Sequence, residues 1–156
     1  MTAPEPIVED LVLLFAALST TTQAHVTATI AQAGFGDLRP SDGFVVQHLQ
    51  HGPVSISDLA DKLGITAQGV SKTVIEMERK GYVTRTASSG DQRKRLVELT
   101  SRGWDAIHAS RRARADLNRQ LRATLGPGAR AFLDQVHQLA ETTGAMAALT
   151  ERRLRP

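Results

Sequence analysis

Three adjacent cations, Arg93, Lys94 and Arg95, lie in the stretch SSGDQRKRLVELT, which occupies residues 88 to 100. This stretch begins with turn-forming residues and ends with alternating apolar and polar residues, which is typical of a hairpin tip followed by a strand. The first strand of the hairpin corresponds to YVTRT, residues 82 to 86. Because guanidinium and ammonium groups on an exposed loop attract anions, the tip is a candidate contact for a polyanion.

Basic residues are concentrated around this hairpin. The whole chain has a formal net charge of +3, whereas residues 79 to 102 hold seven basic and two acidic side chains, a net charge of +5. The basic residues are Arg79, Lys80, Arg85, Arg93, Lys94, Arg95 and Arg102. A positive field on one element is expected for a protein that binds nucleic acid, although a solvated charged face is the alternative.

A second set of candidate contacts lies in TAQGVSKTVIEM, residues 66 to 77. Three apolar residues at helical spacing predict the buried face of a helix: Val70, Val74 and Met77. Thr66 is the predicted N-cap, and Gln68, Ser71 and Lys72 then lie on the outward faces near the N-terminal end. Glutamine pairs with adenine, while serine and lysine reach phosphate or guanine. An ordinary solvent-exposed helix face is the alternative interpretation.

Catalytic and metal-binding patterns are poorly represented. The chain has no Gly-x-Ser-x-Gly motif, no phosphate-binding glycine loop and no cysteine nucleophile. His48 with His51, and His137 with Glu141, each share a helical face, but a metal site needs at least three ligands. We therefore predict no enzyme activity, no metal site and no cofactor. A small enzyme that uses the histidines is the alternative, without a supporting constellation of groups.

Helical periodicity dominates the chain outside the hairpin. One apolar stripe runs through residues 11 to 30, and GFGDLRP breaks the helix that carries it. Ser41 is the predicted N-cap of a second helix, which ends before HGP. Ser55 and Asp58 predict the capping box of a third helix, which ends at Gly64.

The order of these elements predicts the fold. The third helix, the turn GIT and the helix that follows Thr66 form a helix-turn-helix, and the hairpin comes directly after it. A helix-turn-helix followed by a two-stranded ribbon is a winged helix, whose second helix enters a major groove. The predicted fold class is therefore mainly α with a small β-wing, with further helices at both ends of the chain.

The segment ISDLADKLGITAQGVSKTVIEMERKGYVTRTASSGDQRKRLVELTSRG, residues 56 to 103, resembles the MarR family of bacterial winged-helix transcription regulators. The similarity includes the two-helix core, KGYVTR at the start of the wing, Asp91-x-Arg93, and VxLT ending at Thr100 with Gly103 after it. The rest of the chain fits the family outline of one helix before this segment and two long helices after it. LGPGAR departs from the acidic helix start that many members have there.

The resemblance implies a homodimer that binds a pseudo-palindromic DNA site, with wing arginines in the minor groove. It also implies control by a small molecule or by oxidation. Because the chain has no cysteine, the members that sense oxidants through cysteine are excluded as models, and so are disulfides and thiolate metal sites. By this resemblance Arg93 is the wing arginine of the present chain.

The terminal helices predict a dimerisation lobe. Thr100 is the predicted cap of a helix that reaches Leu125, and a further helix after GPG carries apolar residues close to heptad spacing: Phe132, Val136, Leu139, Met146 and Leu149. Such a seam predicts a helical partner, in the same chain or in a second subunit. We expect one domain over residues 1–156, with a DNA-binding lobe at about 40–100 and a dimerisation lobe at about 7–33 and 101–150.

An effector site is predicted between the two lobes. His25 and His48 are polar residues on otherwise apolar stretches, and Arg39 is a candidate for holding a carboxylate. Satisfied interior histidines are the alternative. The predicted function is a homodimeric DNA-binding regulator, a repressor released from a pseudo-palindromic operator by a small molecule such as an aromatic acid. A winged-helix protein-interaction module without DNA binding is the alternative.

The N-terminus predicts a cytoplasmic location. MTAPEPIVED is acidic and contains proline, unlike the basic start of an export signal. The apolar run LVLLFAAL has eight residues, which is too short to span a bilayer. We therefore expect a soluble protein with double-stranded DNA as its partner and no association with a membrane.

Overall fold

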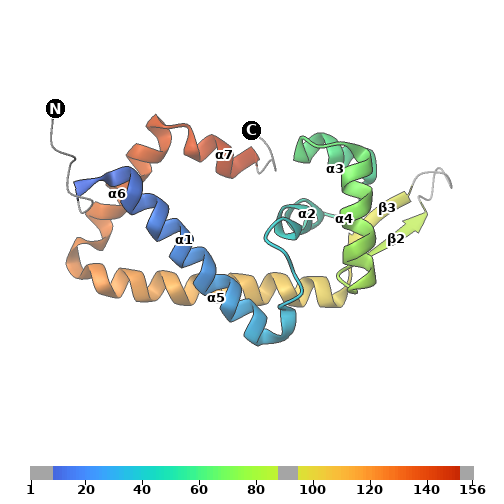
Figure 1. The fold of residues 1–156 in the computed structure, drawn as a ribbon, viewed down its shortest axis with the longest axis horizontal. Helices are drawn as coiled ribbons and strands as arrows, with labels where there is room; N and C mark the ends of the chain where they lie inside the picture. The colour runs from blue at the N-terminus through green and yellow to red at the C-terminus, as the bar shows by residue number, and fades with distance from the viewer. Residues whose placement is uncertain (1–8, 88–94, 152–156) are drawn as a thin grey trace, which may run out of the picture.

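The computed structural model describes residues 9 to 87 and 95 to 151, in which helices dominate and three short strands form one sheet (Figure 1). The helices are α1 (Leu11–Ile30), α2 (Asp42–Leu49), α3 (Ile56–Leu63), α4 (Ala67–Arg79), α5 (Ser101–Leu125), α6 (Ala129–Thr142) and α7 (Ala145–Glu151). The strands are β1 (Val54–Ser55), β2 (Val83–Ala87) and β3 (Arg95–Leu99). The predicted fold class, mainly α with a small wing, is confirmed.

The helix-turn-helix is built as its caps predict. Ser55 Oγ accepts a hydrogen bond of 3.1 Å from the backbone N–H of Asp58 and begins α3, which ends at Gly64 in the left-handed region, at φ 67°. Thr66 Oγ1 accepts a bond of 3.1 Å from the N–H of Gly69 and begins α4. These side chains satisfy amide groups that have no partner within their own helix, which is why α3 and α4 begin where they do.

The predicted cap of α2 is wrong. Ser41 has helical backbone angles, φ −63° and ψ −32°, and its side chain makes no capping bond. The carboxylate of the next residue, Asp42, instead turns back and accepts a hydrogen bond of 2.9 Å from the N–H of Arg39. Asp42 is buried, so the start of α2 is held by a charged group inside the protein rather than by an exposed hydroxyl.

The wing belongs to a three-stranded antiparallel sheet in the order β1-β3-β2. Val83 pairs with Leu99 and Arg85 with Val97, so the two long strands form the predicted hairpin. The third strand, β1, pairs with β3 through Val54 and Val97 and was not predicted. Two residues are too few to show the alternation from which a strand is recognised.

One apolar core joins α2, α3, α4, the sheet and the first half of α5. Its fully buried large side chains are Val45, Leu49, Leu59, Leu63, Val70, Val74, Met77, Tyr82, Val83 and Val97. Tyr82 is buried at the base of the wing. Thr100 caps α5 as predicted, accepting a bond of 3.1 Å from the N–H of Gly103. A Cβ on Gly103 would lie 2.2 Å from the carbonyl oxygen of Tyr82, so only glycine allows α5 to start this close to the wing.

The helix α1 covers the predicted stripe of residues 11 to 30. The π-helical turn Ala31–Phe35 follows it, and Gly34 in this turn, at φ 95°, is the predicted break. By length and composition alone, the segment Leu11–Phe35 is able to cross a membrane. The eight-residue run LVLLFAAL, which we judged too short to span a bilayer, stops before Ser19. The helix itself continues, because hydroxyls such as that of Thr22 bond to carbonyls one turn earlier. The segment is not buried in this chain, and α1 packs along α5 (Figure 1).

The last predicted helix is two helices. Gly144, at φ 76°, ends α6, and α7 starts at the next residue in a different direction (Figure 1). Met146 and Leu149 are therefore not on the helix that carries Phe132, and the predicted continuous seam from residue 132 to residue 149 is wrong. Periodicity did not reveal the break because the apolar spacing happens to continue across the turn.

Candidate nucleic-acid interface

The helix α4 presents its predicted contact residues outward. Gln68 and Lys72 are exposed and Ser71 is half-buried, while Val70, Val74 and Met77 on the other side are 0% exposed. Ile75, one turn after Ser71 and Lys72, is 47% exposed. The capped N-terminus carries free amide groups and a partial positive charge, which suits a phosphate. The outward face is thus polar at its N-terminal end and apolar at Ile75.

The predicted wing contacts are only partly described. Arg93 and Lys94 lie outside the described residues, and Arg95 is exposed at the start of β3. Arg85 donates bonds of 2.9 Å and 2.5 Å to Glu78 Oε2 at the end of α4. These bonds hold the pKa of Glu78 below its usual value, against the opposing effect of burial. Arg85 therefore ties the wing to α4 in this structure.

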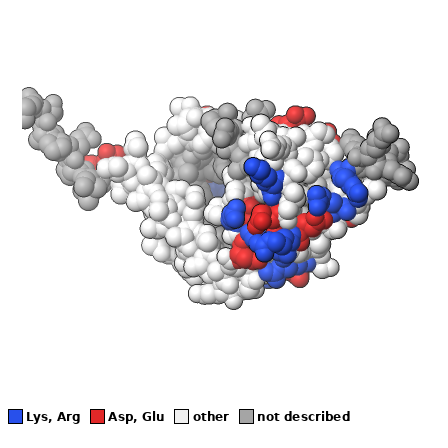
Figure 2. Space-filling view, turned by 45° about the vertical axis from the view of Figure 1, so that its right-hand side comes forward, with Lys and Arg blue, Asp and Glu red and all other residues white. Residues whose placement is uncertain are grey.

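Acidic partners also neutralise other basic residues of the segment from 79 to 102. Arg79 lies 3.2 Å from Glu76, and Arg102 lies 3.4 Å from Asp37. Figure 2 shows that basic and acidic side chains are intermixed on the face that it presents. The net charge of +5 counted for residues 79 to 102 overstates the positive field. The acidic partners of these basic residues lie before residue 79 and were not counted: Glu76, Glu78, Asp37 and Asp42.

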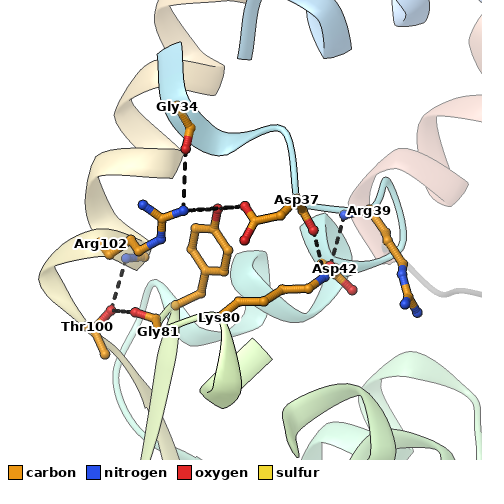
Figure 3. A network of polar contacts seen from close by, with 10 residues as sticks. Gly34, Asp37, Arg39, Asp42, Lys80, Gly81, Thr100 and Arg102 are labelled. Carbon is orange, nitrogen blue, oxygen red and sulfur yellow. Dashed lines mark hydrogen bonds and ion pairs between the residues drawn. The ribbon is translucent and has the colours of Figure 1, made fainter. Parts of the chain in front are cut away.

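Asp37, Tyr82 and Arg102 form a polar network at the base of the wing (Figure 3). The hydroxyl of Tyr82 donates to Asp37 Oδ1, and Arg102 donates a bond of 3.0 Å to the same hydroxyl. The Arg102 guanidinium also lies over the Tyr82 ring, 4.7 Å from its centroid. Burial and the bond to Asp37 raise the pKa of Tyr82 to about 12. The Tyr82 bond is the main reason that the pKa of Asp37 is lowered.

Lys80 extends this network to α2. Its ammonium donates a bond of 2.6 Å to the carbonyl of Asp37 and lies 3.7 Å from the buried carboxylate of Asp42. Lys80 is the C-cap of α4 and its side chain is 11% exposed. Lys80 and Arg102 were counted from the sequence as part of a basic surface, but both hold the segment between α1 and α2 in place.

A cavity of about 1310 Å³ lies among α1, α2 and α5. Two of the three predicted effector residues, Arg39 and His48, line it, whereas His25 is exposed on α1 and is not among its lining residues. Sequence reasoning missed three further cationic or titratable residues of the lining: His51, Arg111 and Arg114. No Asp or Glu lies among the described lining residues. The cavity therefore combines apolar walls with a positive lining.

The residues that were missed left little signal in the sequence. Arg111 donates a bond of 2.5 Å to Gln50, which also lines the cavity but is 61 positions away in the chain. His48 and His51, considered as a metal pair, line the cavity together. Within the described residues no group of three or more His, Cys, Asp or Glu is placed to hold a metal ion.

Comparison with known proteins gives matches for the winged-helix segment and for the whole fold. Residues 37–94 match the model of the MarR family. YdgJ of Bacillus subtilis, described as an uncharacterized HTH-type transcriptional regulator, is 30% identical over 83 residues, 53% of this chain and 51% of YdgJ. The riboflavin kinase of Thermoplasma acidophilum is 38% identical over 65 residues, 42% of this chain and 27% of the kinase. The chain thus spans about half or less of the length of these relatives.

Solved structures match over nearly the full chain. The YusO protein of Bacillus subtilis has a TM-score of 0.70 at 21% identity and covers 92% of this chain and 99% of its own. A mutant of S. aureus MepR, bound to an oligodeoxyribonucleotide, has a TM-score of 0.62 at 21% identity, with 90% and 98% covered. Residues 37–94 of this chain thus match the MarR family model, and the chain as a whole shares the fold of the YusO and MepR proteins.

Proposed function

We propose that the protein is a homodimeric repressor that binds a pseudo-palindromic operator through α4 and the wing. The observation that carries the proposal is the row of Gln68, Ser71 and Lys72 on the outer side of α4, opposite a fully buried face. A helix held in this way by its own core is rigid enough to read base edges in a major groove. The DNA-bound MepR structure, which has the same fold, supports this use of the fold.

The wing takes the second part of the interface. Arg95 is exposed, and the predicted Arg93 and Lys94 precede it in the chain. We assign Arg93 to the minor groove and Lys94 and Arg95 to phosphates. Arg85 is bonded to Glu78, so its first role is to hold the wing against α4. We expect it to contact DNA only when the bond to Glu78 breaks.

Dimerisation places two copies of α4 on one side of the DNA. The apolar residues exposed on α1, α6 and α7 supply the surface for a second copy of the chain. Two recognition helices about 34 to 36 Å apart fit successive major grooves of one operator. A protein that binds DNA works in the cytoplasm, and we assign this protein to it. The apolar side chains of α1 are then covered by the second copy of the chain and not by a membrane.

The cavity among α1, α2 and α5 is the proposed effector site. Its apolar walls and its cationic lining, without a carboxylate among the described lining residues, favour an organic anion such as an aromatic acid. Arg39 is assigned to the carboxylate and His48 to a hydrogen bond with the ligand. His25 is not assigned to the site because it lies outside the lining.

Selection of duplexes from a random DNA library, followed by titration of Gln68→Ala, tests the DNA-binding proposal. We expect a selected palindrome, and a loss of about 1 to 3 kcal/mol of discrimination at one base pair per half-site. Lys62→Ala, an exposed cation of α3, is the control and leaves discrimination unchanged. Equal weakening on every duplex would make Gln68 a phosphate contact.

A winged-helix protein-interaction module remains the alternative function, and the mixed charges around α4 are the observation that favours it. The two functions differ in their response to salt. Binding to DNA weakens steeply as salt rises because counterions are released from the phosphates. Failure to select any duplex at low salt would support the interaction module.

A further inference from the structure

The segment between α1 and α2 has two different neighbours. Phe35, Leu38, Arg39 and Pro40 line the cavity. Asp37, in the middle of the same segment, contacts Lys80, Tyr82 and Arg102 (Figure 3). We call residues 34–42 the linker. The linker is thus one wall of the cavity and also a contact of the junction between α4 and the wing.

The junction itself is a rigid block. Thr100 Oγ1 donates a bond of 2.5 Å to the carbonyl of Gly81, and the N–H of Thr100 donates one of 3.1 Å to the carbonyl of Tyr82. The start of α5 lies so close to Tyr82 that no side chain fits at Gly103. The end of α4, the start of the wing and the start of α5 therefore move together.

Asp37 is the residue through which the linker holds this block. Its carbonyl accepts from Lys80 at the end of α4, and its carboxylate accepts from Tyr82 and Arg102. Two further linker contacts are weak: Arg102 lies 3.4 Å from the carbonyl of Gly34, the same distance as from the Asp37 carboxylate, and Lys80 lies 3.7 Å from Asp42. Because hydrogen bonds weaken steeply beyond about 3.2 Å, a shift of the linker by about 1 Å would break these contacts.

We propose that Asp37 is a positioning residue that couples occupancy of the cavity to the placement of the recognition helix and wing. A molecule that fills the cavity pushes Leu38 and Arg39, which directly follow Asp37 in the chain. The block then loses its tie to the linker, and α4 and the wing become more mobile. The coupling to DNA rests on the proposed function, whereas the coupling to the block does not.

The chain has no cysteine, so a single introduced cysteine can be labelled selectively. A label attached at the cavity fills it even though the natural ligand is unknown. Ser110 of α5 lines the cavity and is half-buried, so Ser110→Cys is a small change that places one thiol there. Benzyl methanethiosulfonate loads this thiol with an aromatic ring as a mixed disulfide, which dithiothreitol removes. Ala115→Cys, exposed on α5 and outside the lining, is the matched control.

Amide hydrogen exchange measures the result without DNA. Loading of the Ser110→Cys variant is expected to speed exchange at residues 77 to 83 about fivefold or more, and dithiothreitol is expected to reverse it. Loading of the Ala115→Cys variant is expected to leave these residues unchanged. In the Asp37→Ala background, exchange there is expected to be fast before loading and to rise no further, since the bonds from Tyr82 and Arg102 to the carboxylate are already lost.

Two results would overturn the proposal. One is unchanged exchange at residues 77 to 83 after loading at position 110, and the other is an equal increase with and without Asp37. Should Asp37→Ala not fold, Tyr82→Phe removes only the donated hydroxyl and keeps the ring beneath Arg102, so it takes the same place in the experiment.

A DNA arm separates this proposal from the proposed function. With a selected duplex, loading at position 110 is expected to weaken binding about tenfold, and Asp37→Ala is expected to remove that effect. If exchange responds and no duplex is ever bound, the coupling stands and the proposed function fails. If a duplex is bound and neither exchange nor affinity responds to loading, the coupling fails and the proposed function stands.

Discussion

The winged-helix part and the terminal helices bury their apolar residues in opposite ways. Every fully buried large side chain of the described residues lies between Val45 and Val97, in the helix-turn-helix, its preceding helix and the sheet. The large apolar side chains that stay exposed are concentrated on α1, on the second half of α5 and on α6 and α7: Leu11, Val12, Leu13, Leu14, Phe15, Leu18, Leu121, Leu125, Phe132, Leu139 and Leu149. One part of the chain completes its core alone, and the other does not.

This difference indicates where the protein needs a partner. Exposed apolar side chains that lie together mark a contact surface, whereas scattered ones do not. The helix α1 has no buried residue although it packs along α5, so one chain covers only one of its sides. We therefore predict that the winged-helix part is stable as a single chain and that order in the terminal helices depends on association.

The largest expected effect lies in the self-contained core. Leu59→Ala removes a side chain that is 0% exposed and is expected to lower the free energy of unfolding by about 2 to 5 kcal/mol, as a cavity remains. Denaturant titration at two protein concentrations measures it. A loss that disappears at high concentration would show that the core also depends on association and would remove the contrast between the two parts.

A charge on α1 tests the other half of the comparison. Leu18 is 51% exposed in the single chain, and Leu18→Glu is expected to raise the dimer dissociation constant about 100-fold, because two carboxylates would be buried in the interface. Sedimentation equilibrium should show a shift from twice 16.9 kDa toward 16.9 kDa. Lys62→Glu on α3 is the control, and the same mass for Leu18→Glu and wild type would exclude α1 from the interface.

The charges near α4 offer a smaller effect. Glu78→Gln weakens the restraint on Arg85, and we expect several-fold tighter binding to random duplex DNA, with a salt dependence steeper by about one ion per subunit. Asp61→Asn also removes one exposed negative charge, but no described cation is bonded to that carboxylate. Fluorescence anisotropy at several salt concentrations measures the affinity of both variants for random duplex DNA. An equal gain in affinity in the two variants would leave Arg85 without a role in binding.

The smallest effect is confined to alkaline pH. Tyr82 is the only tyrosine, so tyrosinate absorbance is expected to titrate near pH 12 in the folded protein rather than near 10. The pKa of Tyr82 is higher in the folded than in the unfolded protein, so the protonated hydroxyl stabilises the fold. This contribution to the free energy of unfolding is fully present below pH 10 and is lost as the pH rises toward 12. Tyr82→Phe is expected to lack this loss. A native titration midpoint near 10 would contradict the burial of the Tyr82 hydroxyl together with its hydrogen bond to Asp37.

Much of the fold was predictable because its signals are local. Ser55, Thr66 and Thr100 each cap the helix that follows, and a capping bond joins residues three positions apart. Val70, Val74 and Met77 are buried as their spacing predicts. The same local reasoning went wrong at Ser41, where Asp42 makes the bond, and across Gly144, where the apolar spacing hides a turn.

The candidate site was predictable only in the residues that face outward. Gln68 and Lys72 were placed on the exposed side of α4 because the buried side is recognisable from periodicity. The state of the cations was not predictable. Arg85 and Glu78 are seven positions apart across a turn, and Arg102 and Asp37 are 65 apart, so nothing in the sequence pairs them.

By itself, the sequence determined the helices of the winged-helix part, the order in which they are joined to the hairpin, and the side of α4 that faces the core. These depend on short-range hydrogen bonds and on apolar periodicity, both of which are local properties of the chain. The tertiary structure alone decided which charges are neutralised and which residues face the cavity. An ion pair depends on the distance between two side chains in space, and the network of Asp37, Lys80, Tyr82 and Arg102 exists only because folding brings the linker against the base of the wing.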